Sequence, residues 1–457
     1  MTLAGDYAET SDNSAQVVKV LNGNTSAAGA IIPPGRRDFA LSLVPINDFK
    51  SFGGSITGEL DLGGIMLRSL TAQRGVRQHA LTDNDRTQLN TGFSELRIRQ
   101  DTFSQEVTLA SDGSGPLSWI VGGFYFRDIA KTPLFRLNGN PFITSEIDTY
   151  SVAGFSEVTY QLTDKLSILG GIRYSYEHKD FDAFRTTGRV ADESKGWGAW
   201  TPRASIRYKP TDETSVYFTY SEGFKSGAYL ATVVPAASVN PEYIKSYEAG
   251  LKFARGPNYF NLAGYYYDYT DLQVSIFQPG AAILRNAASA RIYGIEAEGM
   301  ATFSDAFNLR AGIAYNNSKY SSFPDAVILV PRPTGGNLQM NGDATGNRLV
   351  RSPKFTANAT ANIMVPTGDD GLLTFTGAAS YNSGFFWNVS NRLKQPEYLI
   401  LNGSISWKSD STPLSVSLWG RNLTNKTYGV FVTDTTAADA ISYGRPRSFG
   451  VALGFDF

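Results

Sequence analysis

The sequence predicts an all-β protein, a transmembrane antiparallel up-and-down β-barrel with about 18 strands. Three observations support this prediction. Residues 448–457 alternate strictly, with large apolar side chains at every second position. Segments with the same alternation recur from the first residues onward, and short turns alternate with long connections between them. A single such strand also fits a soluble sheet, but about ten tilted residues are enough to cross a bilayer, and the repetition favours a barrel.

Individual strand segments carry one apolar and one polar face. The apolar faces hold Leu166, Ile168, Gly170, Ile172, Tyr174 and Tyr176; Val216, Phe218 and Tyr220; and Leu414, Val416 and Leu418. The opposite faces hold Ser167, Gly171, Arg173, Ser175 and Glu177; Ser215, Thr219 and Ser221; and Ser415 and Ser417, with Leu169 as an exception. We expect the apolar faces to contact lipid and the polar faces to line a wet lumen, the reverse of a soluble barrel.

The connections between these strands differ in length. Short turns rich in Asp, Ser and Gly lie at residues 111–113, 163–165, 210–213, 304–306, 367–371 and 409–412. Long polar connections span residues 11–51, 75–92, 130–146, 181–196, 223–242, 321–352 and 423–444. Short periplasmic turns and long extracellular loops are typical of outer-membrane barrels. A β-propeller is not favoured, because no four-strand grouping repeats.

Composition excludes several other classes of protein. The 457 residues include no Cys and two His, His79 and His178, so clusters of thiolate or imidazole metal ligands and thiol nucleophiles are excluded. A net charge of −1 gives no basic patch for nucleic acid. No 18-residue apolar run offers a spanning helix. Residues 1–10 lack a signal-peptide pattern, so we expect either that an amino-terminal part is missing or that the protein is not exported.

Aromatic residues cluster near predicted strand ends. The runs are Phe124, Tyr125 and Phe126, and Tyr265, Tyr266, Tyr267 and Tyr269. We interpret them as girdles at the membrane interface, where a ring finds both apolar contact and water. The alternative is that Tyr is simply common in strands.

Several sequence segments resemble segments of the β-barrel part of TonB-dependent receptors. They are residues 103–111 (FSQEVTLAS), 220–227 (YSEGFKSG), 241–252 (PEYIKSYEAGLK), 267–273 (YDYTDLQ), 286 through 293–298 (YGIEAE), 420–428 (GRNLTNKTY) and 443–450 (YGRPRSFG) through Phe457. The resemblance implies a 22-stranded barrel in the bacterial outer membrane, plugged by an amino-terminal domain. It also implies uptake of scarce nutrients, most often ferric siderophores, with energy relayed by TonB.

The sequence departs from that family in what it lacks. We find no signal peptide, TonB box or plug, and the strand count is about four short, so residues 1–457 are expected to be one partial barrel domain. Each unpaired backbone group at a strand edge in hydrocarbon costs several kcal/mol. We therefore expect the chain to close as a smaller barrel, to recruit strands or to fail to insert, and not to carry energised transport by itself.

The expected partners are outer-membrane lipid, a small-molecule metal chelate, and the TonB system only through a plug. The resemblance to the family's closing strand assigns Phe455 and Phe457 as the membrane-assembly signal. The lumen-facing cations Arg173, Arg203 and Arg207 either attract anionic chelates or, as we favour, bond to a plug. No cofactor is expected, and the ligand-binding residues cannot be identified from the sequence.

The other candidate sites have simpler interpretations. Asp83-Asn84-Asp85 opens like a calcium loop, but Gln88 stands where the turn Gly is needed, so we favour a solvated loop. His178 and His79 are expected to be ordinary exposed residues. The triplets that begin at Asn402, Asn422 and Asn425 match the glycosylation pattern, and we attribute them to chance.

Two other functions, an outer-membrane hydrolase and a passive porin, are alternatives to the receptor function. An outer-membrane hydrolase needs a Ser and a His oriented by an acid, and neither His lies beside a distinctive Ser motif, so no enzyme is predicted. A passive porin shares the barrel pattern and is the stronger alternative. An open barrel would give large steady conductance in planar bilayers, whereas a plugged receptor would give almost none.

Overall fold

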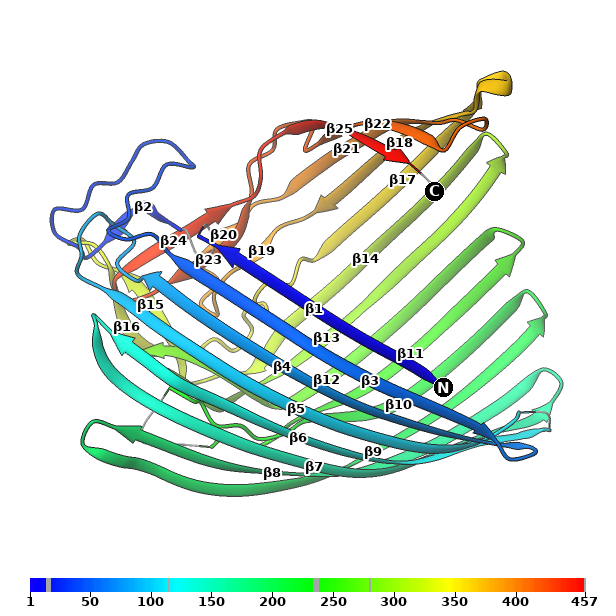
Figure 1. Ribbon diagram of the computed structural model, residues 1–457, viewed down its shortest axis with the longest axis horizontal. Helices are drawn as coiled ribbons and strands as arrows, with labels where there is room; N and C mark the ends of the chain where they lie inside the picture. Colours follow the sequence, from blue (N-terminus) through cyan, green and yellow to red (C-terminus); the bar gives the residue numbers. More distant parts are fainter. Residues whose placement is uncertain (14–17, 114, 233–237, 279–280, 456–457) are drawn as a thin grey trace.

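One large sheet dominates the protein (Figure 1). The computed structural model describes residues 1–13, 18–113, 115–232, 238–278 and 281–455. Within them 18 strands form a single sheet that curves around a central lumen, as the sequence predicted. Strands that follow one another in this sheet are paired antiparallel, for example β7 with β8 and β8 with β9.

The strands of the large sheet are β1 (Thr2–Asp12), β3 (Ile46–Asp61), β4 (Ile65–Asp83), β5 (Phe93–Ser111), β6 (Leu117–Leu137), β7 (Asn140–Thr163), β8 (Leu166–Arg185), β9 (Gly188–Thr211), β10 (Thr214–Lys225), β11 (Glu242–Arg255), β12 (Asn258–Gln278), β13 (Ala281–Ser304), β14 (Phe307–Ser322), β17 (Phe355–Pro366), β18 (Leu372–Asn382), β21 (Tyr398–Lys408), β22 (Leu414–Arg421) and β25 (Ser448–Phe455). Smaller sheets are formed by β15 (Ala326–Pro331) with β16 (Asn337–Gly342), by β19 (Phe385–Phe386) with β20 (Lys394–Gln395), and by β24 (Ala438–Tyr443) between β2 (Lys19–Thr25) and β23 (Gly429–Asp434). A single turn of 3-10 helix, η1 (Gly368–Asp370), precedes β18. No helix in the described ranges is long and apolar enough to span a membrane.

The two ends of the barrel differ as predicted. All six predicted short turns separate consecutive strands of the large sheet, and they lie at the end on the right of Figure 1, here called the turn end. The opposite end, here called the loop end, carries β2, β15, β16, β23 and β24. The long connection of residues 383–397, which contains β19 and β20, was not foreseen.

Two of the predicted long loops are wrong over nearly their whole length, and a third, residues 75–92, is wrong in its first half, because residues 75–83 belong to β4 and pair with β5. Residues 130–146 and 181–196 continue the ladders of β6 with β7 and of β8 with β9. The turns are only residues 138–139 and 186–187, with Asn138 and Gly139 at positive φ. Polar residues in these hairpins suggested loops, but their backbone groups are paired strand to strand. β7 and β9 reach 24 residues each, well beyond the ten or so needed to cross a bilayer.

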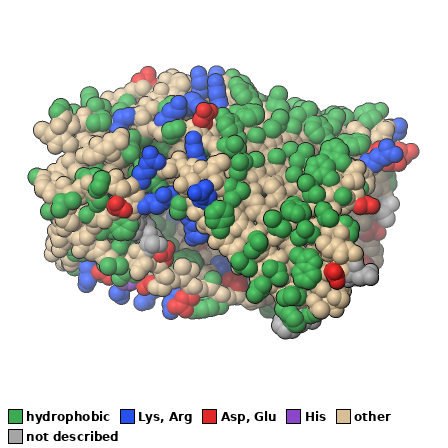
Figure 2. Space-filling model, turned by 90° about the horizontal axis from the view of Figure 1, so that it is seen from above, with side chains coloured by type: hydrophobic (Ala, Val, Ile, Leu, Met, Phe, Trp, Pro, Cys, Tyr) green, Lys and Arg blue, Asp and Glu red, His purple; other side chains and the backbone are tan. Residues whose placement is uncertain are grey.

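Apolar side chains point outward, away from the lumen. Ile172 is 48% exposed, Phe218 46% and Val451 64%, although they alternate with polar neighbours that face inward. Figure 2 shows hydrophobic side chains gathered over the half of the molecule nearer the turn end, whereas the loop half is mostly polar. The predicted orientation of the two strand faces is therefore confirmed.

The aromatic runs do not form girdles as complete units. Tyr125 and Tyr266 are exposed on the outer face. Their neighbours point the other way: Tyr265 stacks on Tyr267 with ring centroids 4.9 Å apart, and Phe124 lies under the guanidinium of the lumen-facing Arg173. Adjacent residues of a strand must face opposite sides, so every second ring of a run can reach the membrane interface.

Buried apolar residues lie near the loop end and do not fill the barrel. One cluster contains Phe181 and Trp197 on strand extensions, a second contains Tyr320 and Phe323, and a third contains Leu393 with residues of β23 and β24. These clusters pack the loops together and leave the lumen walls polar.

The first and last strands of the large sheet are both edges. β1 pairs with β3, β25 pairs with β22, and no backbone pairing joins β1 to β25 within the described residues. At the loop end, however, β2 pairs with β24, and Lys19 lies opposite Ile441. The gap between the edge strands β1 and β25 is here called the seam. The β2–β24 pairing joins the chain segments next to these strands at the loop end of the seam.

Candidate functional site

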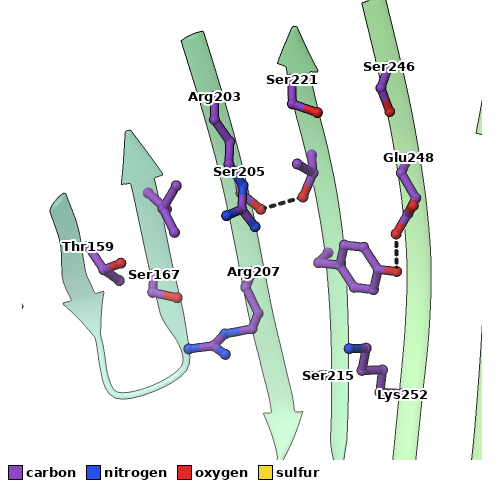
Figure 3. A pocket seen from close by; sticks show the side chains of 13 residues that line it. Thr159, Ser167, Arg203, Ser205, Arg207, Ser215, Ser221, Ser246, Glu248 and Lys252 are labelled. Atoms are coloured by element: carbon purple, nitrogen blue, oxygen red, sulfur yellow. Dashed lines mark hydrogen bonds between the residues drawn. The ribbon is translucent and has the colours of Figure 1, made fainter. Parts of the chain in front are cut away.

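A polar hollow of about 710 Å³ lies on the lumen wall of β7 to β11. It exists because the inward positions of these strands carry Ser, Thr and charged residues at every second place. Figure 3 shows the side chains that line it: Thr159, Ser167, Arg203, Ser205, Arg207, Ser215, Ser221, Ser246, Glu248 and Lys252 are labelled.

Hydrogen bonds between neighbouring strands hold this wall in place. The Tyr217 hydroxyl donates to Glu248 Oε1 at 2.5 Å, and the hydroxyls of Ser205 and Thr219 lie 2.8 Å apart, as the dashed lines in Figure 3 mark. The ammonium of Lys252 lies 5.5 Å from the centre of the Tyr217 ring. The strands therefore present a fixed set of polar groups to the lumen.

The hollow is positively charged. Its lining holds three cations, Arg203, Arg207 and Lys252, and one carboxylate, Glu248. Arg203 also donates to Glu157 Oε2 at 3.2 Å, whereas Arg207 has no ion pair in the described part of the chain. An anion that passes along this wall would be attracted, and a cation repelled.

Arg173 shares the lumen but lies outside this hollow. Its guanidinium lies 5.7 Å from the centre of the Phe124 ring and 5.4 Å from that of Phe155, and its Nε donates to Ser175 Oγ at 2.9 Å. The structure therefore brings Arg203 and Arg207 together in this hollow and places Arg173 on a neighbouring part of the wall.

A buried charge network, here called the loop network, ties several connections together at the loop end. Arg392 donates to both oxygens of Asp439, with Nη1–Oδ2 at 2.6 Å and Nη2–Oδ1 at 2.8 Å, and Nη2 lies 3.3 Å from Asp434 Oδ2. Asn337 Nδ2 adds a hydrogen bond of 2.9 Å to Asp439 Oδ1, and Asn388 Nδ2 one of 2.7 Å to Asp434 Oδ2. Burial raises the pKa of Asp439, but the hydrogen bonds from Arg392 and Asn337 and the charge of Arg392 outweigh it and hold the pKa below its usual value.

The segment Asp83-Asn84-Asp85, which opens like a calcium loop, is stabilised by hydrogen bonds of its own. Asp85 is buried and accepts two hydrogen bonds at Oδ1 from Thr87, and three at Oδ2 from Thr91 and Gly92. Burial raises the pKa of Asp85, but these donors hold it below its usual value. Asp83 is buried as well and accepts hydrogen bonds from Ser42. The interpretation as a merely solvated loop is wrong in this respect, because both carboxylates hold the turn from inside.

His178 lies beside a hydroxyl and a carboxylate, yet these groups do not form a catalytic triad. Its Nε2 is 2.9 Å from Ser194 Oγ and 3.2 Å from Asp180 Oδ1. In a triad the acid must bond the other ring nitrogen, and here Nδ1 faces the Tyr176 hydroxyl at 3.5 Å. His79 Nε2 lies 3.0 Å from Glu95 Oε1. No group of three or more His, Asp or Glu suited to a metal ion occurs among the described residues.

The three asparagine triplets are engaged in local structure. Asn422 is buried, its Nδ2 donates to the carbonyl oxygens of Lys426 and Arg445, and its backbone amide donates to Asn402 Oδ1. Asn425 Oδ1 accepts a hydrogen bond from the Arg447 amide. These side chains hold the turn that follows β22.

Phe455 ends β25 on the outer face and is 59% exposed. Phe457 lies outside the described residues. The sequence reasoning missed other residues, namely Arg392 and Asn388 of the loop network and the neighbouring Trp387. The aromatic run of residues 385–387, followed by Arg392, was an available signal in a segment that had not been recognised as a loop.

Comparison with known proteins gives consistent matches. The family model described as TonB dependent receptor-like, beta-barrel matches residues 2–423. The pesticin receptor of Yersinia enterocolitica is 22% identical over 381 residues, which cover 79% of this chain and 52% of that receptor. The ferric-pyoverdine M114 receptor PbuA of Pseudomonas sp. (strain M114) is 27% identical over 324 residues, or 66% of this chain and 36% of PbuA. The chain therefore spans about half the length of the first relative, and less of the second.

Solved structures show the same fold. The ferric yersiniabactin uptake receptor FyuA from Yersinia pestis matches with a TM-score of 0.80 and 17% identity, covering 100% of this chain and 67% of FyuA. The siderophore receptor PiuA from Acinetobacter baumannii matches with a TM-score of 0.77 and 17% identity, covering 99% of this chain and 71% of PiuA.

Proposed function

This chain belongs to the TonB-dependent receptor family, whose β-barrel model covers residues 2–423, and on that premise we propose that it forms the wall of a receptor for ferric siderophores. It is an outer-membrane β-barrel with apolar side chains facing lipid. The ligand would be captured at the loop end and would pass along the lumen, without covalent chemistry.

One observation carries the proposal: the polar hollow on the lumen wall has three cations and one carboxylate, inside a barrel whose outer face is apolar. Such a wall favours passage of a polar, anionic solute over a cation or an apolar molecule. FyuA is the ferric yersiniabactin uptake receptor and PiuA is a siderophore receptor, which supports the same ligand class.

We propose further that contact with the TonB system requires a plug, as the family implies. The described residues form a barrel wall and its loops, and no folded domain among them occupies the lumen. The seam also leaves two strand edges without a pairing to each other in the described residues. We therefore expect these 457 residues alone not to carry energised uptake.

The alternatives are weaker. The passive porin is not supported, since the named relatives are receptors. A hydrolase is not supported either, since Asp180 and Ser194 approach the same nitrogen of His178. Esterase activity of the purified protein in detergent is expected to be absent.

Binding of iron chelates tests the proposal. The purified chain, folded in detergent, is expected to retain iron-55 siderophores in a saturable manner, and Arg207→Glu combined with Lys252→Glu should weaken the retention of anionic chelates. Absence of saturable retention for every chelate would contradict the receptor function. TonB-dependent uptake by cells that express only this chain would contradict the expected inactivity.

A further inference from the structure

A second cavity, of about 590 Å³, lies at the loop end and is separate from the lumen hollow. Its walls come from β12, from β15, from residues 320–323 before and 349–351 after the β15–β16 hairpin, from residues 387–390 and from β23. Its floor is apolar: Phe323 and Tyr320 are almost fully buried there and belong to one packed cluster. Phe431, in contrast, is 40% exposed, so the cavity has a side open to solvent.

Arg351 brings to this cavity a positive charge that has no ion-pair partner among the described residues. Its guanidinium lies 5.1 Å from the centre of the Trp387 ring and 5.9 Å from that of Phe431. The backbone is fixed at φ 54°, and the Arg351 amide donates to the Phe386 carbonyl oxygen at 2.7 Å. No carboxylate of the described residues pairs with this side chain. Aromatic faces hold a guanidinium in place without neutralising it, so its donors remain available to an anion.

Three further polar atoms in the lining lack a protein partner. Trp387 Nε1, Ser390 Oγ and Gln273 Oε1 are buried and have no hydrogen bond within the described residues. Gln273 is held in place, because its Nε2 donates to the carbonyl oxygens of Ser226 and Asn240. Buried polar groups normally find hydrogen-bond partners, so these three atoms are candidates to bond a polar ligand that enters the cavity.

The carboxylate in the lining, Asp434, already has protein partners, although it shares Arg392 with Asp439. Asp434 lies 3.3 Å from Arg392 and accepts a hydrogen bond from Asn388 at 2.7 Å. The groups left for a ligand are therefore one guanidinium, an indole N–H, a hydroxyl and an amide oxygen, around an apolar floor. This set suits a flat apolar group that carries anionic oxygen.

We propose that this cavity binds an aromatic ring bearing an anionic oxygen, as an aryl carboxylate or phenolate arm of an iron chelate. The ring would lie over the apolar floor, and the oxygen would accept from Arg351 and Trp387. This assignment rests on the proposed function and narrows its ligand class to anionic aryl chelates. Ferric chelates that are neutral and without rings would leave the guanidinium and the indole N–H unpaired.

The test compares two iron-55 chelates on the full chain in detergent: a trianionic ferric tris-catecholate and a neutral, ring-free ferric trihydroxamate. We expect the catecholate to bind at least ten-fold more tightly. Arg351→Gln should weaken catecholate binding at least ten-fold, and Trp387→Phe, which keeps a ring and removes the N–H, several-fold. Free 2,3-dihydroxybenzoate should compete weakly if the arm alone is recognised, and its failure to compete would contradict recognition of the aryl arm.

Arg348→Gln is the matched control, because Arg348 lies 5.9 Å from the centre of the Phe386 ring in the same connection but does not line the cavity. Its catecholate binding should be unchanged. Circular dichroism verifies folding, and if Arg351→Gln does not fold, Arg351→Lys should bind the catecholate more weakly because it loses the planar pair of donors. Equal binding of both chelates, or unchanged binding by the folded Arg351 variant, would overturn this inference and leave the receptor function standing. Retention of neither chelate would overturn both.

Discussion

Replacing Arg392 with Met should open the loop network while the barrel stays folded. The substitution removes both bonds to Asp439, the contact with Asp434 and the Nε hydrogen bond to the Leu329 carbonyl oxygen. Loss of one partner of a buried ion pair costs about 3–5 kcal/mol. The Asp439 side chain is 6% exposed but that of Arg392 is 24%, so we take the lower end, about 3 kcal/mol. That corresponds to a roughly 100-fold change in the local opening equilibrium.

Hydrogen exchange followed by mass spectrometry measures this opening. Amides of β2, β23 and β24 should exchange about 100-fold faster in the variant, whereas those of β7 and β8 should not change. Adding Asp439→Asn should recover part of the protection, because the buried charge is then removed. Arg447→Met serves as the control, since Arg447 is exposed and makes one side-chain contact of 3.3 Å with the Leu423 carbonyl oxygen. Exchange in β24 that stays within about three-fold of the wild-type rate would refute the reasoning.

Three further predictions concern pH, the lipid face and assembly. The pKa of Asp439 is lower in the folded protein than in the unfolded chain, so the stability that this carboxylate contributes is complete above the unfolded pKa of about 3.9 and is lost as the pH falls below that value. Exchange protection of β24 should therefore be flat from about pH 8 to 5 and should decline below about pH 4. A decline near neutral pH would contradict this prediction. Ile172→Arg, on the outer face, should lower the free energy of folding into lipid bilayers by about 2–4 kcal/mol in a denaturant titration, whereas Ser221→Arg in the lumen should have little effect. Equal losses of stability in the two variants would contradict the assignment of the outer and lumen faces. Phe455→Ala combined with Phe457→Ala should reduce assembly into the outer membrane several-fold, measured as the heat-modifiable fraction on gels, and unchanged assembly would show that these rings are not the assembly signal.

The strand pattern was predictable because lipid enforces it. Each residue of a spanning strand faces either lipid or lumen, so outward Ile172 and inward Arg173 follow from alternation alone. The same rule shows why Tyr265 and Tyr266 could not share a girdle. Short turns such as residues 163–165 could also be predicted from the sequence, since their side chains form hydrogen bonds with the local backbone.

The loop end was not predictable in the same way. Polar residues in 181–196 are compatible with a loop or with a solvated hairpin, and only the pairing partner decides between them. Likewise, Arg392 meets Asp439 from 47 positions away, a contact that neither periodicity nor local motifs encode. Arg351 was not recognised because its role depends on the rings of Trp387 and Phe431, which belong to two other connections.

The pairing of β2 with β24 has a consequence for biogenesis. Lys19 and Ile441 meet although roughly 420 residues separate them, and bringing such distant points together from a flexible chain costs about 5 kcal/mol of entropy. The contact can therefore form cheaply only after the intervening hairpins have been laid down. It would be among the last to appear after synthesis, and a nascent polypeptide released early would have no means of making it.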